Sequence, residues 1–505
     1  MCGILGIIGS QNVTHDLYNG LMAIQHRGQD SAGIVTFDET FKLKKGIGLV
    51  KDVFLENNFE NSSLNKLTGN MGLAHVRYST IGTPDELNAQ PFTVSYPFGL
   101  AMVHNGNLTN FVNLKDILYK ENHRLVSSSC DLELILYVFA SELEKIDLNN
   151  LNFEQLVEVV TKTQKRISGA YSTLTMIANN GLLAFTDPHG IRPMVMGEKI
   201  DDNGSISYAF ASESTCFDYL GYKLIKDLAP GEIIYIERKE DKLFIHSNIN
   251  KNDKNNKKEQ YFCIFEYIYF AREDSIIHGL NVAKVRESIG KLLATRLKSE
   301  IANKNISPDI IIEVPSSAFY FAWGLSKALS IEYAKGFAKN NFIGRSFIKP
   351  TPAGRKNTIK QKLNPIKEIV RDKNILVVDD SLVRGNTSKH IISILKEAGA
   401  KEIYFVSAAP PIKHPCVYGI DMSTKTELLA ATLDENQIAK LIGADKVYFQ
   451  SIDQLINMCE MRLKVNCCYA CFNGKYPTHV DDRIFADVSN ERHLSQGNYE
   501  YECRK

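Results

Sequence analysis

The sequence predicts an α/β protein in two halves, and three observations support this prediction. The first half mixes short β-favouring runs with helical patterns, the second repeats the order strand, helix, strand, and a polar segment at residues 246–260 separates them. That segment is nearly free of apolar residues, so an element formed there would have nothing to bury. At 505 residues the chain is also too long for one core, which predicts several domains.

The first half shows the pattern expected of sheets covered by helices. Runs of apolar and β-branched residues predict its strands, and apolar residues at helical spacing predict its helices. We expect strands at residues 3–8, 32–37, 72–77, 171–178 and 181–185, and helices at 16–25, 108–119 and 132–143. The first domain is placed at residues 2–245.

The second half alternates more regularly. We expect strands at residues 310–314, 375–378 and 403–408, with helices at 318–329 and 388–398, the latter ended by Gly399. Such alternation indicates a mostly parallel sheet with helices on both faces. The second domain is placed at residues 260–475, followed by a C-terminal tail at 476–505.

Composition argues against several kinds of partner. Lys and Arg number 59 against 58 Asp and Glu, and a net charge of +1 gives no electrostatic basis for nucleic acid or an anionic membrane as the main partner. No stretch approaches the ~18 apolar residues of a membrane span, and the first apolar run, residues 4–8, lacks the features of a secretory signal. We therefore expect a cytoplasmic protein whose ten cysteines are free, catalytic or metal-bound rather than paired.

Cys2 is the first candidate for chemistry. Removal of Met1 would leave it carrying both a thiol and a free α-amino group. An α-amino group titrates near pH ~7.7, so it can take a proton during attack without a distant histidine. Thiol and amine together form a self-contained nucleophile and base. Considered alone, such a cysteine is more often an ordinary small residue near a terminus.

Residues 374–388 combine a buried strand, an acidic pair and a tight loop that opens a helix. Backbone N–H groups and the dipole at a helix start favour a phosphate, and Gly385 permits its close approach. The Thr387 and Ser388 hydroxyls can donate to its oxygens, while Asp379 and Asp380 would suit ribose hydroxyls or a magnesium ion. The structural alternative treats Asp380 and Ser381 as turn residues and Thr387 as a helix cap.

Two shorter patterns are ambiguous. Residues 104–107 contain Asn-Gly, the commonest hairpin signal, and are interpreted first as a turn. Cys468 and Cys471 form a Cys-x-x-Cys spacing that could hold a metal, be redox active or have no function.

Residues 377–388 resemble the phosphoribosyl pyrophosphate signature of phosphoribosyltransferases, in the form carried by the glutamine phosphoribosylpyrophosphate amidotransferase (amidophosphoribosyltransferase) family. Residues 340–348, 362–366 and 410–421 are also similar to that family, so the resemblance covers nearly the whole chain. It implies an N-terminal-nucleophile αββα sandwich with glutaminase activity, followed by a type I phosphoribosyltransferase domain with a parallel α/β sheet.

The chain departs from the family pattern in the second half. Asn386 stands where the family often has threonine, a conservative change in a loop that binds mainly through backbone groups. Residues 314–318 resemble the pyrophosphate loop Val-Pro-Asp-Ser-Gly, but Ser316 and Ala318 remove its acid and its glycine. Ser317 still matches the family's metal-associated serine. These two departures bear on the affinity of this loop for pyrophosphate.

The resemblance also implies roles for residues of the first half. Cys2 matches the nucleophile, Asn105 and Gly106 match the donors of an oxyanion hole, and Asp131 matches the acid that holds the α-ammonium of glutamine. Arg77 ends a strand-like run, where its planar fork suits the α-carboxylate, although without its neighbours a surface ion pair would be the better interpretation.

Residues 25–33 resemble the region that shapes this site. His26 within it is expected to be structural, because a free α-amine needs no Cys-His pair. Cys130 departs from the residue usual beside the matching acid and is assigned no role.

In the second half the resemblance implies a phosphoribosyl pyrophosphate site with bound Mg²⁺. Ser317, Asp379 and Asp380 would hold the metal ion. The expected binding residues are Asp379, Asp380, Ser381, Arg384, Gly385, Asn386, Thr387 and Ser388. Residues 349–364, rich in Lys, Arg and Thr, are the expected lid over this site.

Some members of the family carry a structural [4Fe–4S] cluster. Its ligands match Cys263, Cys416, Cys468 and Cys471 in this sequence. Four thiolates suit iron–sulfur, with tetrahedral zinc as the alternative.

The resemblance implies an enzyme that hydrolyses glutamine and transfers the ammonia to carbon 1 of phosphoribosyl pyrophosphate, at the start of purine synthesis. It further implies a homo-oligomer, a dimer or tetramer, inhibited by purine nucleotides. Two alternatives are kept: another amidotransferase of the same N-terminal type, which residues 377–388 argue against, and a catalytically impaired purine sensor, for which Ser316 and Ala318 are the only support.

Overall fold

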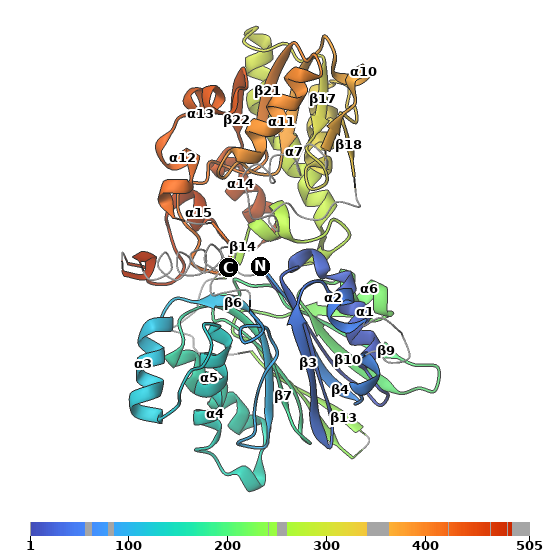
Figure 1. Ribbon diagram of the computed structural model, residues 1–505, viewed down its shortest axis with the longest axis vertical. Coiled ribbons are helices and arrows are strands. Elements are labelled where there is room, and N and C mark those ends of the chain that lie inside the picture. Colours follow the sequence, from blue (N-terminus) through green and yellow to red (C-terminus); the bar gives the residue numbers. More distant parts are fainter. Residues whose placement is uncertain are drawn as a thin grey trace, which may run out of the picture.

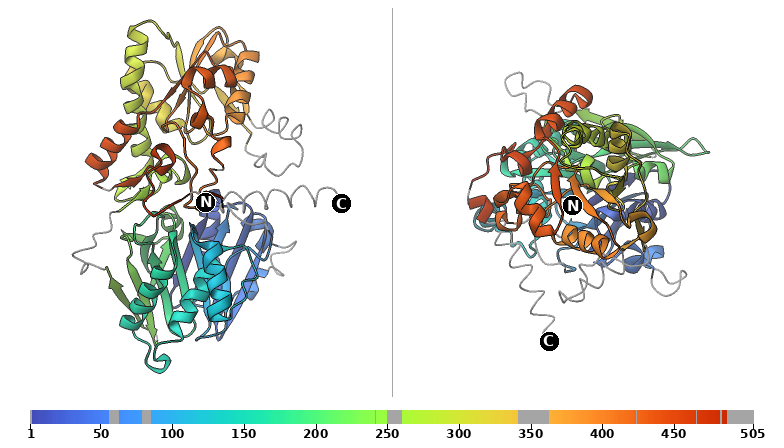
Figure 2. Two further views of the ribbon diagram at one scale, coloured as in Figure 1. Left: turned by 90° about the vertical axis from the view of Figure 1, so that its left-hand side faces the viewer. Right: turned by 90° about the horizontal axis from the view of Figure 1, so that it is seen from above.

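The computed structural model describes residues 2–55, 63–78, 85–240, 242–249, 260–340, 363–422, 424–464, 466–481 and 483–486. Its two halves are stacked along the long axis of the molecule, with the first half below the second in Figure 1, and Figure 2 shows the same arrangement from the side. The predicted division into two α/β halves is confirmed.

Two antiparallel sheets form the centre of the first half. The first sheet has the order β11 (Lys223–Asp227), β9 (Val195–Ile200), β10 (Ile206–Ala211), β1 (Gly3–Ile8), β4 (Met71–Arg77), β2 (Ser31–Asp38) and β3 (Thr40–Ile47). The second has the order β13 (Lys242–Asn248), β12 (Ile233–Lys239), β8 (Gly181–Thr186), β7 (Gly169–Ile177), β6 (Leu100–Leu108) and β5 (Phe92–Val94). All five predicted strands lie in these sheets.

The sheets pack face to face, and helices cover their outer faces. Ile4 and Leu73 of the first sheet share a buried cluster with Val103 and Leu174 of the second. The first sheet packs on α1 (Thr14–Ala23), α2 (Val50–Phe54) and α6 (Thr215–Leu220), and the second on α3 (Phe111–Asn122), α4 (Asp131–Leu143) and α5 (Phe153–Arg166). Short 3₁₀ turns lie at Gln25–Arg27, Ser63–Lys66 and Leu148–Asn150. The result is the predicted αββα sandwich.

A four-stranded parallel sheet forms the centre of the second half. Its order is β17 (Ile310–Glu313), β20 (Asn374–Asp379), β21 (Glu402–Ser407) and β22 (Lys446–Phe449). Buried residues alternate between its faces, so that Leu376 and Val378 face one cluster while Ile375 and Val377 face the other. On one face lie α7 (Val282–Ala302), α8 (Phe319–Leu329) and α14 (Ile452–Met458), and on the other α11 (Asn386–Glu397) and α13 (Glu435–Ile442). The predicted parallel sheet with helices on both faces is confirmed.

Smaller elements surround this sheet. Short helices are α10 (Lys367–Val370), α12 (Leu429–Thr432) and α15 (Ala470–Asn473), with a 3₁₀ turn at Lys425–Glu427 and π-helical turns at Glu266–Phe270 and Cys459–Leu463. Two-stranded pairs are β14 (Phe262–Cys263) with β23 (Cys467–Cys468), β15 (Ile276–Ile277) with β16 (Leu280–Asn281), and β18 (Phe337–Lys339) with β19 (Leu363–Pro365).

The halves share a buried junction. Ala170 and Ile191 of the first half belong to the hydrophobic cluster of the second half, so apolar contact continues across the boundary. The predicted domain limit at residue 245 falls within β13, which ends at Asn248. At the other limit, Tyr476 at the start of the predicted tail donates to the Pro415 carbonyl oxygen at 2.6 Å. In the part of the chain that is described, no helix combines the length and apolarity that a membrane crossing requires.

Candidate active sites

Cys2 lies directly before β1, and the N-terminal end of the chain is marked where the halves meet in Figure 1. Its backbone nitrogen donates to Asn105 Oδ1 at 3.3 Å, and its Sγ lies 3.9 Å from the Tyr78 carbonyl oxygen. Arg27 Nε donates to the Cys2 carbonyl oxygen at 3.0 Å. These contacts fix the backbone of the predicted nucleophile from both of its ends while its side chain stays partly accessible.

Asn105 and Gly106 lie inside strand β6, so the interpretation of residues 104–107 as a hairpin turn was wrong. They pair with Ser172 and Tyr171 of β7. The glycine answers a packing need, because a Cβ at Gly106 would lie 1.9 Å from the Ala170 carbonyl oxygen. Asn105 Nδ2 is buried without a hydrogen-bond partner among the described residues. A buried donor of this kind is costly unless a ligand supplies the acceptor.

A small pocket brings the other predicted residues of the first half together. Arg77 and Asp131 line it with Cys2 and Gly106. Asp131 accepts from the Leu108 N–H at 2.9 Å, and its Oδ1 lies 3.2 Å from His104 Nε2. Burial opposes ionisation of Asp131, but His104 and the Leu108 N–H outweigh it and lower the pKa of this carboxyl. The pocket therefore holds a cation and an anion beside the thiol, as an α-amino acid would require.

Three residues at this site were missed by the sequence reasoning. His104 faces Asp131, Gln90 Oε1 accepts from the His104 N–H at 2.8 Å, and Arg27 holds the Cys2 carbonyl. Arg27 and His104 belong to segments 25–33 and 104–107, which were singled out from the sequence. Those segments indicated the region of the site but not the roles of these two residues. His26, expected to be structural, lies with its Nε2 2.9 Å from Glu213 Oε1.

In the second half the predicted phosphate loop follows β20 as expected. Asp379 ends the strand, Gly385 adopts φ +73°, and α11 starts at Asn386. At this start the Ser388 side chain is buried, and Asn386 and Thr387 are exposed. Arg384 Nη2 donates to Glu427 Oε2 at 3.1 Å and is directed to that neighbour.

The two aspartates form a buried pair. Asp380 accepts from the Ser317 hydroxyl and, at 2.6 Å, from the Ser381 hydroxyl, and its own N–H donates to Asp379 Oδ1 at 2.9 Å. Burial and then the charge of Asp380 raise the pKa of Asp379 well above its usual value. Burial also raises the pKa of Asp380, against the two serine hydroxyls and Arg286. A bound cation would favour the ionised form of both acids and so offset the cost of burying their charges, which makes this pair a favourable cation site.

The structure describes the surroundings of the two residues that depart from the family pattern, Ser316 and Ala318. Ser316 is exposed, and Lys339 Nζ donates to its hydroxyl at 2.6 Å. Ala318 is buried at the start of α8. Of the expected lid at residues 349–364, only Leu363 and Asn364 are described, in β19, and the rest lies outside the described residues.

Comparison with known proteins decides the family. A glutamine amidotransferase domain model matches residues 75–219, and a phosphoribosyl transferase domain model matches residues 285–421. The amidophosphoribosyltransferase of Escherichia coli strain K12 is 40% identical over 96% of this chain and 94% of its own. That of Saccharomyces cerevisiae is 36% identical over 97% of this chain and 95% of its own. The chain belongs to the amidophosphoribosyltransferase family.

Structural similarity agrees with this assignment. The solved glutamine phosphoribosylpyrophosphate amidotransferase from B. subtilis, in complex with ADP and GMP, matches with a TM-score of 0.80 and 34% identity over 95% of this chain and 98% of that one. Amidophosphoribosyltransferases are glutamine-dependent pentosyltransferases, so the chain is an enzyme that draws nitrogen from glutamine and attaches it to a phosphoribosyl group. Nothing in the comparisons favours the other amidotransferases or the impaired sensor.

The four cysteines assigned to an amidophosphoribosyltransferase cluster gather beside the junction. Cys263 pairs with Cys468 across β14 and β23, and all four side chains are buried. Cys416 and Cys471 lie close enough to these two for their charges to interact. Burial raises the pKa of Cys263 to about 11. Cys263 and Cys468 are thus neighbours, but no group of three or more His, Cys, Asp or Glu side chains in the described ranges is arranged as metal ligands.

A second, larger hollow lies elsewhere in the first half. Asp38, Thr68 and Arg238 are among the residues that line it. None of the predicted site residues lines this hollow.

Proposed function

We propose that Cys2 cleaves glutamine and that the ammonia attacks carbon 1 of phosphoribosyl pyrophosphate held by the loop after β20. The products are phosphoribosylamine, pyrophosphate and glutamate. The observation that carries this proposal is the arrangement at β6. Asn105 accepts from the Cys2 nitrogen through Oδ1, and its buried Nδ2 has no partner in the described part of the chain. A buried donor of this kind suits an oxyanion hole, because the substrate oxygen supplies the acceptor that the described residues lack.

The glutaminase step uses the first residue alone for proton transfer. With Met1 removed, Cys2 sulfur bonds to the carboxamide carbon while its proton passes to the α-amino group. The C–N bond then breaks as that proton moves to the departing nitrogen, which leaves ammonia and a thioester. Water hydrolyses the thioester to glutamate and restores the thiol. Arg77 and Asp131 hold the α-carboxylate and α-ammonium of the substrate during these steps.

The second step forms a bond from ammonia nitrogen to carbon 1 and breaks the bond from that carbon to pyrophosphate, which leaves with the electron pair. The nitrogen then loses a proton. The loop from Ser381 to Ser388 binds the 5-phosphate at the start of α11, where backbone N–H groups favour an anion. A magnesium ion, when bound, would neutralise charge on the pyrophosphate.

Ser317, Asp379 and Asp380 are the proposed magnesium residues. Their mutual contacts and the raised pKa values of both acids support this assignment. Mg²⁺ commonly binds through one or two carboxylates together with substrate phosphates rather than in an all-protein cage. The chain would therefore complete the site only with substrate present.

Cys263, Cys416, Cys468 and Cys471 are the proposed ligands of a structural [4Fe–4S] cluster. The burial of all four side chains and the pairing of Cys263 with Cys468 support the proposal, and four thiolates suit iron–sulfur better than most metals. Such a cluster would hold the β14–β23 pair and the segment after β21 together without taking part in the reaction.

Proposals on the regulation, assembly and location of the enzyme rest on the same family membership. We propose that purine nucleotides inhibit the enzyme, that it works as a cytoplasmic homo-oligomer, and that it has no role on nucleic acid or membranes. The complex of the B. subtilis relative with ADP and GMP supports the first of these points.

The decisive experiment changes Cys2→Ser and measures phosphoribosylamine synthesis with either glutamine or free ammonia as donor. Glutamine-dependent synthesis should disappear, while ammonia-dependent synthesis should stay within about twofold because the phosphoribosyl site is untouched. Cys216→Ser, at a buried cysteine of the same half, is the matched control and should keep both activities. Equal loss of both donors in folded Cys2→Ser would contradict the two-site model.

The cluster is tested separately. Anaerobically purified protein should contain iron and labile sulfide, and Cys468→Ser should lose both. Zinc in place of iron would favour the tetrahedral alternative, and absence of either metal in the purified protein would remove the cluster from the proposal.

A further inference from the structure

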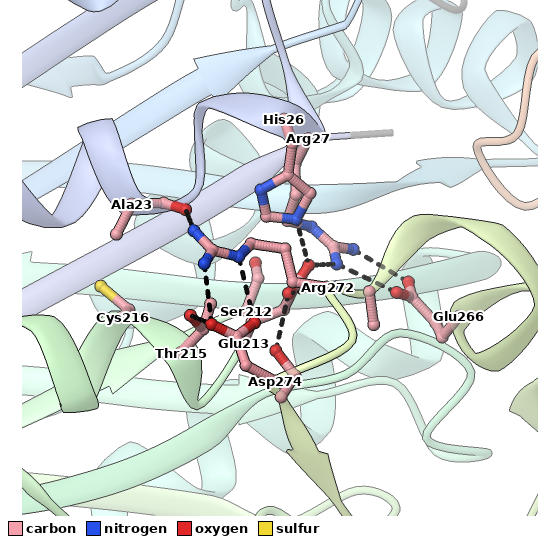
Figure 3. Close-up of polar contacts among 12 residues, drawn as sticks. Ala23, His26, Arg27, Ser212, Glu213, Thr215, Cys216, Glu266, Arg272 and Asp274 are labelled. Atoms are coloured by element: carbon pink, nitrogen blue, oxygen red, sulfur yellow. Dashed lines mark hydrogen bonds and ion pairs between the residues drawn. The ribbon is translucent and has the colours of Figure 1, made fainter. Parts of the chain in front are cut away.

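A buried network of charges lies next to Cys2 at the junction of the halves. Arg27, which holds the Cys2 carbonyl oxygen, lies between two carboxylates in Figure 3. Its Nη1 donates to Glu213 of the first half. Its Nη1 and Nη2 donate to the two oxygens of Glu266, from the second half, at 3.0 and 2.9 Å. The guanidinium is therefore shared between both halves.

The centre of this network is closed to solvent, while His26, whose Nε2 lies 2.9 Å from Glu213 Oε1, borders it with a side chain that is 28% exposed. The side chains of Arg27, Glu213 and Glu266 are all 0% exposed, and a second buried cation, Arg192, has its Nη1 3.8 Å from Glu266 Oε1. Two guanidinium groups thus face two carboxylates. Removing one partner of such a buried pair is strongly destabilising, because the other charge is left uncompensated.

Glu213 is itself bound from the second half. It accepts from the Arg272 N–H at 3.0 Å and from the Ser275 hydroxyl at 2.8 Å, as well as from Arg27. Figure 3 shows Glu213 between Arg27 and the segment that carries Arg272. Both acids that hold Arg27 are therefore positioned by the chain beyond residue 260.

Geometry connects this network to catalysis through one atom. Arg27 Nε donates to the carbonyl of Cys2, the residue whose amine and thiol carry out the proposed chemistry. Near-attack geometry is sensitive, and a misplacement of about 1 Å can cost ~10²-fold in rate. A shift of the guanidinium would move the Cys2 backbone relative to Asn105 and hence relative to the oxyanion hole.

We propose that Glu266, in the phosphoribosyltransferase half, is a positioning residue for the glutaminase nucleophile, acting through Arg27. Glutamine cleavage then depends on how the second half seats against the first. The proposal rests on the proposed role of Cys2. It assigns to Glu266 a function in the chemistry of a domain to which it does not belong.

The test compares Glu266→Gln, which keeps the shape and removes the charge, with Glu266→Asp, which keeps the charge and shortens the reach. Each variant is assayed for glutamine hydrolysis, for synthesis from free ammonia and for inactivation by a glutamine-analogue electrophile. Glu266→Gln should lower kcat for glutamine by about tenfold to hundredfold with KM within about twofold, and slow Cys2 inactivation in parallel. Ammonia-dependent synthesis should stay within about twofold. Glu266→Asp should recover part of the loss.

Asp227→Asn is the matched control. Asp227 Oδ1 accepts from the His278 N–H at 3.0 Å across the same junction and is outside the contacts of Arg27, so its change should leave glutamine kcat within about twofold. The proposal is overturned if Glu266→Gln behaves like this control, or if it lowers both donors equally. Should Glu266→Gln not fold, the same criteria apply to Glu266→Asp. Retained glutamine-dependent synthesis in Cys2→Ser would instead overturn the proposed function, a separate outcome.

Discussion

The two candidate sites are held by different kinds of structure. At the glutaminase site, Asn105 and Arg77 stand within or at the end of sheet strands, and their neighbours are fixed by strand register. At the phosphoribosyl site, Asp379 ends a strand, but the residues from Ser381 to Asn386 belong to a loop and a helix start. The first site is built inside a sandwich, and the second at the edge of a sheet.

This difference determines what each site gives up for function. The glutaminase site leaves one buried donor, Asn105 Nδ2, without a partner among the described residues. The phosphoribosyl site instead buries two carboxylates side by side, with pKa values raised by burial. A missing acceptor and an excess of negative charge are both costs that a substrate can relieve, the first with an oxyanion and the second with a cation.

The largest expected effect breaks the comparison at Asn105. Asn105→Ala should lower glutamine kcat by ~10²–10³ because it removes one oxyanion donor, while synthesis from ammonia stays within about twofold. Steady-state assays with both donors measure this. Asn107→Ala, two positions along the same strand, is the matched control and should lose less than tenfold, because its amide donates to the Val417 carbonyl at 2.9 Å instead. Equal losses in the two variants would remove the special role of Asn105.

The next largest effect is expected at the phosphoribosyl site. Asp379→Asn should lower synthesis from glutamine and from ammonia alike, by about 10²-fold, because both donors attack the same magnesium-bound substrate. Glutamine hydrolysis measured without phosphoribosyl pyrophosphate should be unchanged. Asp309→Asn is the control, since Asp309 Oδ2 accepts from the Asn374 N–H at 2.7 Å at the opposite end of the same strand. Full ammonia-dependent activity in Asp379→Asn would remove Asp379 from the phosphoribosyl site.

A smaller effect tests whether the sites are mechanically independent. Gly419 of the second half has φ +95°, and a Cβ there would lie 2.9 Å from the Gly106 carbonyl oxygen. Gly419→Ala should therefore disturb the oxyanion strand and lower glutamine kcat on the order of tenfold, with little change in ammonia-dependent synthesis. Gly443→Ala controls for backbone strain, because Gly443 has φ +83° but its Cβ would meet only Ile392 at 3.8 Å. Similar kinetics in both variants would show that strain alone acts.

The sequence predicted the local structure around the second candidate site better than that around the first, for a physical reason. The strand, acid pair, loop and helix after Asn374 are contiguous, so local periodicity and a single glycine were sufficient to place them. The first site draws Cys2, Arg77, Asn105 and Asp131 from strands and a helix far apart in the chain. Only the family resemblance could bring these together in advance.

The errors have the same origin. Asn105-Gly106 has the local signature of a turn, but its pairing with Ser172 and Tyr171 overrides that preference, and the glycine is needed where β6 meets Ala170. Glu213 and Glu266 carried no sequence signal, since a buried ion network depends on contacts across more than 180 residues, as in the pair Arg27 and Glu213. Residues placed by tertiary contact alone are the ones that local patterns miss.

The smallest expected effect is on the stability of the protein, and it tests whether the buried acid pair of the phosphoribosyl site is destabilising. The pKa of Asp379 in the folded protein is raised, first by burial and then by Asp380, so the folded state binds more protons than the unfolded state. Stability must then fall as pH rises from the unfolded pKa, near ~3.9, through the raised folded value, and the penalty is fully present above it. Asp379→Asn removes the charge and can still accept from the Asp380 N–H. Without magnesium or substrate it should raise Tm at pH 7 by about 2–4 °C, for roughly 1 kcal/mol, and by less near pH 4. Calorimetry at the two pH values measures this, and an Asn variant no more stable than the parent at pH 7 would show that the acid pair carries no such strain.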